Sequence, residues 1–386
     1  MDQMVSTNIP GYSHPFQSLL ATSADSDGPP MVQRLAEDGS ELPGLNKPDT
    51  ACTRDWAREI YQWMLRVRVY DSRLTALQRQ GRIQFFVPST GEEAVQIGTA
   101  AALRPLDWIF PAYREQGALL HRGLPLRKLL AQLLGSWEDN AKGRQMPDHF
   151  GAHDLRIAFA SSPVGTQIPQ AVGAAWSLRL QREDSAVVVY FGDGATSTGD
   201  FHAGMTLAAV QQAPVVFCCK NNGWAISLPS ARQCRVESLA LKAAGYGMPG
   251  LRVDGNDVFA VYEVTQQALD WSRSGAGPVF IEFVTQRMGP HSTADDPSRY
   301  RDSELMEAWE RRDPLVRVRQ FLERRSWWTA AEEAEFRAAA DSVLIGELCE
   351  AEAAPRPPLE SLVDDVYSDL PWHLKEQRDE VLTWHR

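Results

Sequence analysis

Residues 186–202 read AVVVYFGDGATSTGDFH, and residues 214–227 read PVVFCCKNNGWAIS. Each stretch begins with a run that is apolar throughout, which is typical of a strand buried on both faces of a parallel sheet. The first run ends in Gly-Asp-Gly (192–194) and the second in Lys-Asn-Asn (220–222). The stretch between these motifs has room for one helix and the next strand. The two segments therefore predict a β-α-β unit whose small and polar residues meet at one edge of the sheet.

The same alternation of helices and strands continues outward along the chain. A third apolar run at 279–284 predicts another strand, and an amphipathic helix begins near Asp55. Further helices are expected around 92–103, 125–135, 168–181, 200–212 and 258–272. We predict an α/β protein with a doubly wound, mostly parallel sheet flanked by helices, extended by helices at both ends.

Three regions follow from this pattern. Residues 1–50 are rich in Pro, Gly, Ser and Asp without periodicity, and we expect an extended or partly disordered arm. Residues 51–302 form the α/β domain. Residues 303–386 are charged and helical in pattern, with a Pro-rich break at 355–358, and form a C-terminal extension.

Composition excludes several classes of protein. The 386 residues carry a net charge of −11 without a basic block, so a nucleic-acid partner is not expected. No apolar run approaches the roughly 20 residues of a membrane span. The five cysteines form no Cys-x-x-Cys pair, which indicates a reduced, intracellular protein. With no signal or transit peptide apparent in 1–50, and with arginine far more frequent than lysine, we expect a bacterial, cytoplasmic protein.

The polar residues at the two strand ends predict a metal-diphosphate site. Asp193 and Asn222 offer hard oxygen ligands of the kind that Mg²⁺ prefers when it shares its coordination with phosphate. The flanking glycines permit a close approach of the backbone, and the helix after Gly199 directs its N-terminus to an anion. Taken alone, Gly-Asp-Gly is most often a turn, and Asn-Asn is a weaker signal still. Their combination at two adjacent strand ends favours the metal site.

Several motifs in series resemble one family. Besides the two stretches quoted first, these are KGRQMPDHF (142–150), SSPVGTQIPQAVGAA (161–175), YGMPGLRVDGND (246–257) and GPHSTADDPSRYR (289–301). Together they resemble the alpha subunit of the decarboxylase component of branched-chain 2-oxo acid dehydrogenases, which depends on thiamine diphosphate. The resemblance covers roughly residues 50–386.

The resemblance implies roles for the matching positions. It implies Mg²⁺ ligands at Asp193, Asn222 and the carbonyl of Trp224, where many members have Tyr. It implies a potassium site, present in some members, at Ser161, Pro163, Thr166 and Gln167, although such a segment alone is more often a helix N-cap. The implied contacts with thiamine diphosphate are Tyr113, Arg114, Ser162, Val164, Gly192, Asp193, Gly194, Ala195, Lys220, Asn222, Ala225, Ile226 and His291.

His291 and Ser162 are the residues for which the resemblance implies a catalytic part. His291 lies in a loop that follows the strand at 279–284, and its imidazole can exchange a proton near neutral pH. The resemblance implies that it assists acyl transfer to lipoamide, with Arg287, Asp295 and Tyr300 bracing its loop. The other seven histidines have no comparable sequence context.

The function implied is oxidative decarboxylation of branched-chain 2-oxo acids of the 3-methyl-2-oxobutanoate type. Implied partners are a beta subunit, in an α₂β₂ heterotetramer, and a lipoyl-bearing acyltransferase, within branched-chain amino acid catabolism. The nearest alternative is the alpha subunit of a pyruvate or acetoin dehydrogenase. More remote are a Mg²⁺-dependent phosphohydrolase that uses Asp193 and a non-catalytic scaffold.

Overall fold

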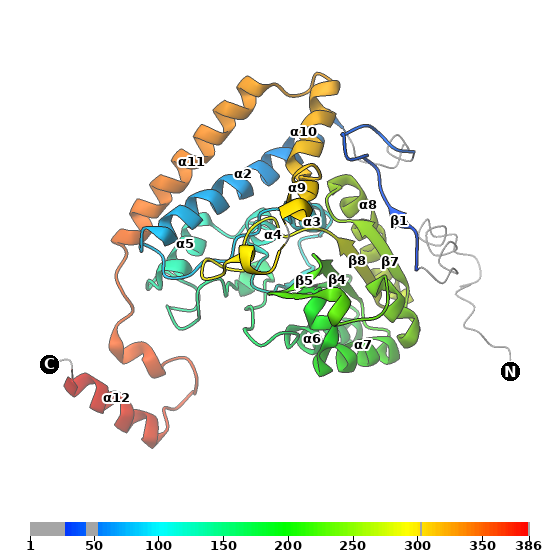
Figure 1. The fold of residues 1–386 in the computed structure, drawn as a ribbon. Helices are drawn as coiled ribbons and strands as arrows, with labels where there is room; N and C mark the ends of the chain where they lie inside the picture. The colour runs from blue at the N-terminus through cyan, green and yellow to red at the C-terminus, as the bar shows by residue number, and fades with distance from the viewer. Residues whose placement is uncertain (1–27, 44–52, 302, 385–386) are drawn as a thin grey trace.

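A six-stranded parallel sheet forms the centre of the computed structural model, which describes residues 28–43, 53–301 and 303–384. The strand order is β1-β7-β8-β4-β3-β2, and helices cover the sheet (Figure 1). The predicted fold class is therefore confirmed. The strands are β1 (Met31–Val32), β2 (Trp108–Phe110), β3 (Val187–Gly192), β4 (Val215–Asn221), β7 (Gly250–Asp254) and β8 (Val279–Val284).

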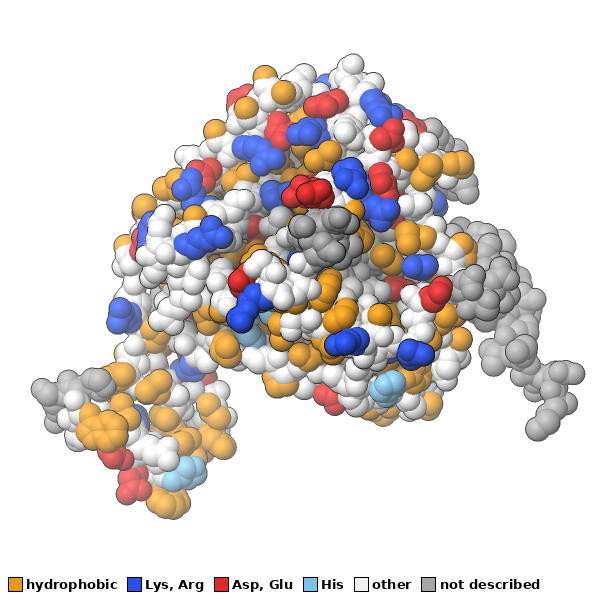
Figure 2. All heavy atoms as spheres, in the orientation of Figure 1, with side chains coloured by type: hydrophobic (Ala, Val, Ile, Leu, Met, Phe, Trp, Pro, Cys, Tyr) orange, Lys and Arg blue, Asp and Glu red, His pale blue; other side chains and the backbone are white. Residues whose placement is uncertain are grey.

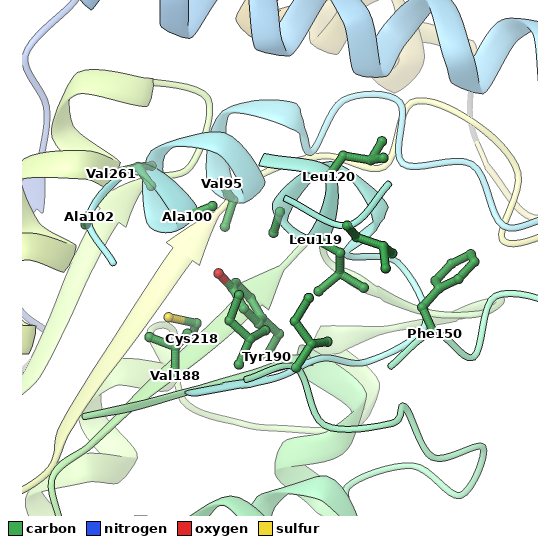
Figure 3. Packing of buried hydrophobic residues seen from close by; sticks show 14 of the residues in the cluster. Val95, Ala100, Ala102, Leu119, Leu120, Phe150, Val188, Tyr190, Cys218 and Val261 are labelled. Carbon is green, nitrogen blue, oxygen red and sulfur yellow. The ribbon is translucent and has the colours of Figure 1, made fainter. Parts of the chain in front are cut away.

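Each face of the sheet has its own hydrophobic core because successive side chains of a strand point to opposite faces. In β3, Val188 and Tyr190 pack on one side, where Tyr190 lies among Val95, Leu119 and other apolar side chains (Figure 3). The residues in between, such as Val189, pack on the other side. Six α-helices contribute to the first core: α2 (Arg54–Arg79), α3 (Glu93–Ala101), α4 (Gln116–His121), α5 (Leu126–Leu134), α8 (Val258–Trp271) and α11 (Ala330–Ala353). The second core contains residues of α6 (Gln167–Gln181), α7 (Gly199–Gln211) and the short 3-10 helix Leu239–Tyr246.

Further helices surround this central unit. The long helix α2 (Arg54–Arg79) packs against α10 (Pro314–Arg324) and α11 (Ala330–Ala353). Helix α9 (Ser303–Glu310) leads into α10, and α12 (Trp372–Trp384) lies apart from the main body (Figure 1). Among the described helices, none is both long enough and apolar enough to cross a membrane.

Within the arm expected at 1–50, residues 28–43 are described, and they pack against the domain. β1 adds an edge strand to the sheet, parallel to β7. The buried carboxylate of Asp257 accepts hydrogen bonds from the backbone N–H groups of Arg34, at 2.5 Å, and Leu35, at 2.6 Å. The Leu35 side chain is fully buried. The rest of the expected arm lies outside the described residues.

Both signs of charge are interspersed over the face that Figure 2 shows, and no extended basic patch stands out on it. That nucleic acid is not a partner stays a prediction from the sequence.

The anchor at Asp257 gives a test of the fold. Asp257 also caps α8 by accepting from the N–H groups of Phe259 and Ala260. We expect Asp257→Ala to cost more than the 0.5–2 kcal/mol typical of a lost helix cap, because two further backbone N–H groups lose their acceptor. Thr329→Ala, which removes the cap of α11 at an exposed position, should stay at about 1 kcal/mol or less. Urea unfolding followed by circular dichroism measures both; equal losses would contradict the anchoring role.

Candidate active site

The site lies where the carboxyl ends of β3 and β4 meet. Gly192 pairs with Lys220 in the register of the two strands, so Asp193, which follows β3, and Asn222, which follows β4, lie at the same edge of the sheet. A cavity of about 510 Å³ opens here. Its lining comprises Glu92, Ala112, Tyr113, Arg114, Ser161, Ser162, Val164, Gly165, Gln167, Phe191, Gly192, Asp193, Gly194, Ala195, Thr198, Lys220, Asn222, Trp224, Ala225, Ile226, Arg287 and His291.

The structure thus brings together nearly all the site residues expected from the sequence. Of these, Pro163 and Thr166 do not line the cavity itself. Thr166 Oγ1 lies 2.7 Å from Ser161 Oγ and 3.0 Å from the carbonyl oxygen of Pro163. Gln167 Oε1 is buried and has no hydrogen-bond partner within the described residues. The oxygen atoms of Ser161, Pro163 and Thr166 therefore lie close together, and Gln167, the next residue, lines the cavity with Ser161.

Asp193 is a buried carboxylate whose side-chain hydrogen bonding is weak. Its side-chain hydrogen bond from Gln233 Nε2 is long, at 3.4 Å. Burial, reinforced by the negative charge of Glu92, raises the pKa of Asp193 to about 6. A cation beside it would reverse this shift by favouring the ionised form. The residue after it is necessarily small, since a Cβ on Gly194 would lie 2.7 Å from the Cβ of Ala225.

Asn222 is held at both ends of its amide. Its Nδ2 donates to Glu92 Oε1 at 2.8 Å, and its Oδ1 accepts from the backbone N–H of Trp224 at 3.1 Å. Trp224 begins a small hairpin formed by β5 (Trp224–Ala225) and β6 (Leu228–Pro229). The backbone that follows at Ile226 has a positive φ of 56°.

Lys220 lines the cavity, but its ammonium group is already paired. It forms ion pairs with Glu92, at 2.9 Å, and with Glu115. Burial alone would raise the pKa of Glu92, yet the charges of Lys220 and Arg114 lower it to about 2. The ammonium group of Lys220 is therefore shared between two buried carboxylates, and a contact between it and a diphosphate stays a prediction.

Two other cations face the cavity without carboxylate partners. Within the described residues, Arg114 and Arg287 are buried and neither guanidinium group forms an ion pair. Burial and the neighbouring charge of Arg114 lower the pKa of Arg287. Buried guanidinium groups without a direct ion pair are costly, so this arrangement favours an anionic ligand. Thr198, the N-cap of α7, places the N-terminus of that helix at the same cavity.

His291 is positioned by donors on one side of its ring. Its Nδ1 lies 3.2 Å from Arg287 Nη1 and 3.4 Å from Arg114 Nη2, and its backbone N–H donates to Asp295 at 2.7 Å. Because a guanidinium group only donates, Nδ1 is the acceptor and Nε2 carries the proton. Burial, and then the positive charges of Arg114 and Arg287, lower the pKa of His291 to about 4. The imidazole is therefore neutral near pH 7.

The loop of His291 is braced as the resemblance implied. Tyr300 donates to Asp295 Oδ2 at 2.5 Å and accepts from Arg287 Nη2 at 3.1 Å. Arg287 also donates to the carbonyl of Ile226 at 2.8 Å. These contacts connect the loop to the hairpin that follows Asn222.

Sequence reasoning missed two residues of this site. Glu92 follows Ser-Thr-Gly at the start of α3, and only its contact with Asn222 reveals its part. His149 is one of the seven histidines whose sequence context predicts no role in the site. Its Nδ1 lies 2.9 Å from the carbonyl oxygen of Pro147, and its Nε2 lies 2.7 Å from Ser162 Oγ. The carbonyl only accepts, so Nδ1 carries the proton, and Ser162 donates to Nε2.

The environment of His291 predicts a pH dependence of stability. Its pKa is about 4 in the folded chain, below the ordinary value of 6.5, so the unfolded chain binds more protons between these values. The wild type should lose stability as pH falls from 6.5 to 4, and His291→Gln should lose less over that window. Melting temperatures against pH, measured without cofactor, test this. A difference between the two proteins that does not change with pH would contradict it.

Comparison with known proteins agrees with the site. Residues 61–360 match the family described as dehydrogenase E1 component. The chain is 40% identical over 357 residues to 2-oxoisovalerate dehydrogenase subunit alpha 2, mitochondrial, of Arabidopsis thaliana, covering 92% of the chain and 75% of the relative. It is 42% identical over 342 residues to the mitochondrial alpha subunit of Dictyostelium discoideum (88% and 78%), and 41% identical over 324 residues to that of Homo sapiens (84% and 73%).

These relatives also correct one expectation. They are named as mitochondrial subunits and come from eukaryotes, so the expected bacterial, cytoplasmic location is not supported. The bias toward arginine over lysine was an unreliable guide because it reflects base composition and not the cell compartment. The family expected from the motifs is confirmed: the chain belongs to the dehydrogenase E1 component family and is similar over most of its length to alpha subunits of 2-oxoisovalerate dehydrogenases.

Proposed function

We propose that the chain is the alpha subunit of a branched-chain 2-oxo acid dehydrogenase and binds the diphosphate half of thiamine diphosphate. The observation that carries the proposal is that one cavity holds buried charges of both signs that form no direct ion pair within the described residues. Asp193 is a buried carboxylate suited to a cation, while Arg114 and Arg287 are buried cations suited to an anion. A metal ion with a diphosphate satisfies both.

In this proposal Asp193, Asn222 and the carbonyl of Trp224 hold Mg²⁺. Arg114, Tyr113 and the N-terminus of α7 receive the diphosphate. Gly192, Gly194, Ala195, Ala225 and Ile226 form the wall at the strand ends. The unpartnered Gln167 Oε1, with the oxygens of Ser161, Pro163 and Thr166, suits K⁺.

The cofactor, when bound, supplies the carbanion chemistry that adds to the keto carbon and releases CO₂. The chain contributes the surroundings. His291, neutral and held by Arg287, presents Nε2–H for proton transfer while the acyl group passes to a lipoyl arm. Ser162 and Val164 line the same cavity and shape it for a branched substrate. The substrate class rests on similarity to proteins named 2-oxoisovalerate dehydrogenase.

The partner is a beta subunit that covers the open side of the cavity, in an α₂β₂ assembly that also serves a lipoyl-bearing acyltransferase. Exposed apolar side chains support this arrangement. Val164 and Ile226 line the cavity, yet each is 54% exposed. Met146, beside Ser162, is 58% exposed. Apolar side chains clustered at the entrance of a cavity are typical of an interaction surface.

The metal site is tested by Asp193→Ala, which should leave the fold intact and abolish Mg²⁺-dependent binding of thiamine diphosphate. The loss should exceed the roughly 100-fold effect typical of changes behind the ligands. Asp184→Ala is the matched control, because Asp184 precedes the same strand at the opposite edge of the sheet and its side chain is 80% exposed. Titration calorimetry measures both affinities; unchanged binding by Asp193→Ala would refute the site.

The subunit arrangement is tested by placing a charge at the entrance of the cavity. Met146→Asp should weaken assembly with the beta subunit by at least about tenfold, because a carboxylate is costly to bury in an apolar interface. Val343→Asp on α11, where the side chain is 55% exposed, should assemble normally. Light scattering of the co-expressed subunits reads out the assembly. Full turnover by the alpha chain alone would remove the need for a partner.

A further inference from the structure

The proposed metal site requires the side-chain amide of Asn222 to present its oxygen to the cation, and Asn222 alone does not fix that orientation. An amide carries an oxygen at one end and an NH₂ group at the other, and half a turn about its last bond exchanges them. The oxygen suits a cation, whereas the NH₂ group repels one. Something must therefore fix which end faces the cavity.

Glu92 provides that constraint. A carboxylate only accepts hydrogen bonds, so it selects the NH₂ end, and Nδ2 of Asn222 donates to Glu92 Oε1 at 2.8 Å. The backbone N–H of Trp224 donates to Oδ1 of Asn222 at 3.1 Å, which favours the same orientation of the amide. The two contacts together leave Oδ1 on the side away from Glu92.

Glu92 is itself fixed in place. Its side chain is fully buried, and its second oxygen lies 2.9 Å from Lys220 Nζ. Lys220 is held in turn by Glu115, which is also buried. The carboxylate therefore has no freedom to turn away from Asn222, and the buried ammonium balances its charge.

We infer that Glu92 is a positioning residue for the metal: it does not coordinate the cation, but it fixes Asn222 with its oxygen available as a ligand. The inference rests on the proposed function, since it presupposes a divalent cation at Asp193 and Asn222. Partners behind metal ligands typically account for about 10–100-fold in affinity. The loss of Glu92 should have an effect of this size.

The test uses the purified complex of alpha and beta subunits, saturating thiamine diphosphate, and Mn²⁺ as a spectroscopic substitute for Mg²⁺. Free Mn²⁺ is counted by electron paramagnetic resonance. Glu92→Gln should weaken Mn²⁺ binding 10–100-fold, because its amide can offer its single oxygen to Asn222 or to Lys220 but not firmly to both. Glu93→Gln is the control: Glu93 is the next residue, equally buried, and is paired with Arg68 outside the cavity. It should bind Mn²⁺ like the wild type.

A second comparison isolates orientation from any general effect on folding. Asn222→Asp puts an oxygen at both ends of the side chain, so its orientation no longer matters. In that background Glu92→Gln should cause no further loss of Mn²⁺ affinity, and its amide can donate to the new carboxylate. Equal losses from Glu92→Gln in both backgrounds, or equal affinity of Glu92→Gln and Glu93→Gln, would overturn the positioning role. A wild type that binds no Mn²⁺ would instead overturn the metal site itself.

Discussion

The parallel register of β3 and β4 is the constraint on which the site depends. Gly192 lies opposite Lys220, and this pairing brings the loops that follow two consecutive strands to one sheet edge. The register is fixed because both strands are buried on both faces, so a shift by one residue would exchange their two cores. The packing of the sheet therefore places Asp193 and Asn222 at the same cavity without the help of a ligand.

The charged side chains around this edge form two groups: those that form ion pairs with one another and those that do not. Glu92 and Glu115 share the ammonium group of Lys220, and Glu92 also accepts a hydrogen bond from Asn222. Asp193, Arg114 and Arg287 line the cavity and form no direct ion pair within the described residues, although the charge of Glu92 acts on each of them. Charged groups that are buried without a direct ion pair lower the stability of the folded chain. A ligand that carries both signs of charge offsets this loss when it binds. The charges of this cavity therefore suit the metal-diphosphate ligand that we propose for it.

Local sequence pattern was sufficient for the long buried elements and insufficient elsewhere. The apolar runs of β3, β4 and β8 predicted strands within a residue or two of the observed bounds. β2 has only three residues, and in the five residues of β7 the alternation of Leu251, Arg252 and Val253 is too short to stand out. The site residues also divide into those that a local motif predicts and those that it does not. Asp193 and Asn222 belong to contiguous motifs, whereas Glu92 acts on Asn222 across 130 residues, and His149 meets Ser162 through tertiary packing that no spacing encodes.

The central claim is that this cavity serves decarboxylation of a branched 2-oxo acid by an assembly of alpha and beta subunits. The most direct measurement is the specificity constant of the reconstituted complex for 2-oxoisovalerate and for pyruvate, with CO₂ release followed in the presence of thiamine diphosphate and Mg²⁺. An apolar pocket distinguishes substrates by about 1–3 kcal/mol per methylene group, so a preference of tenfold or more for 2-oxoisovalerate is the expected result. A higher constant for pyruvate, or no release of CO₂ from either acid, would contradict the account.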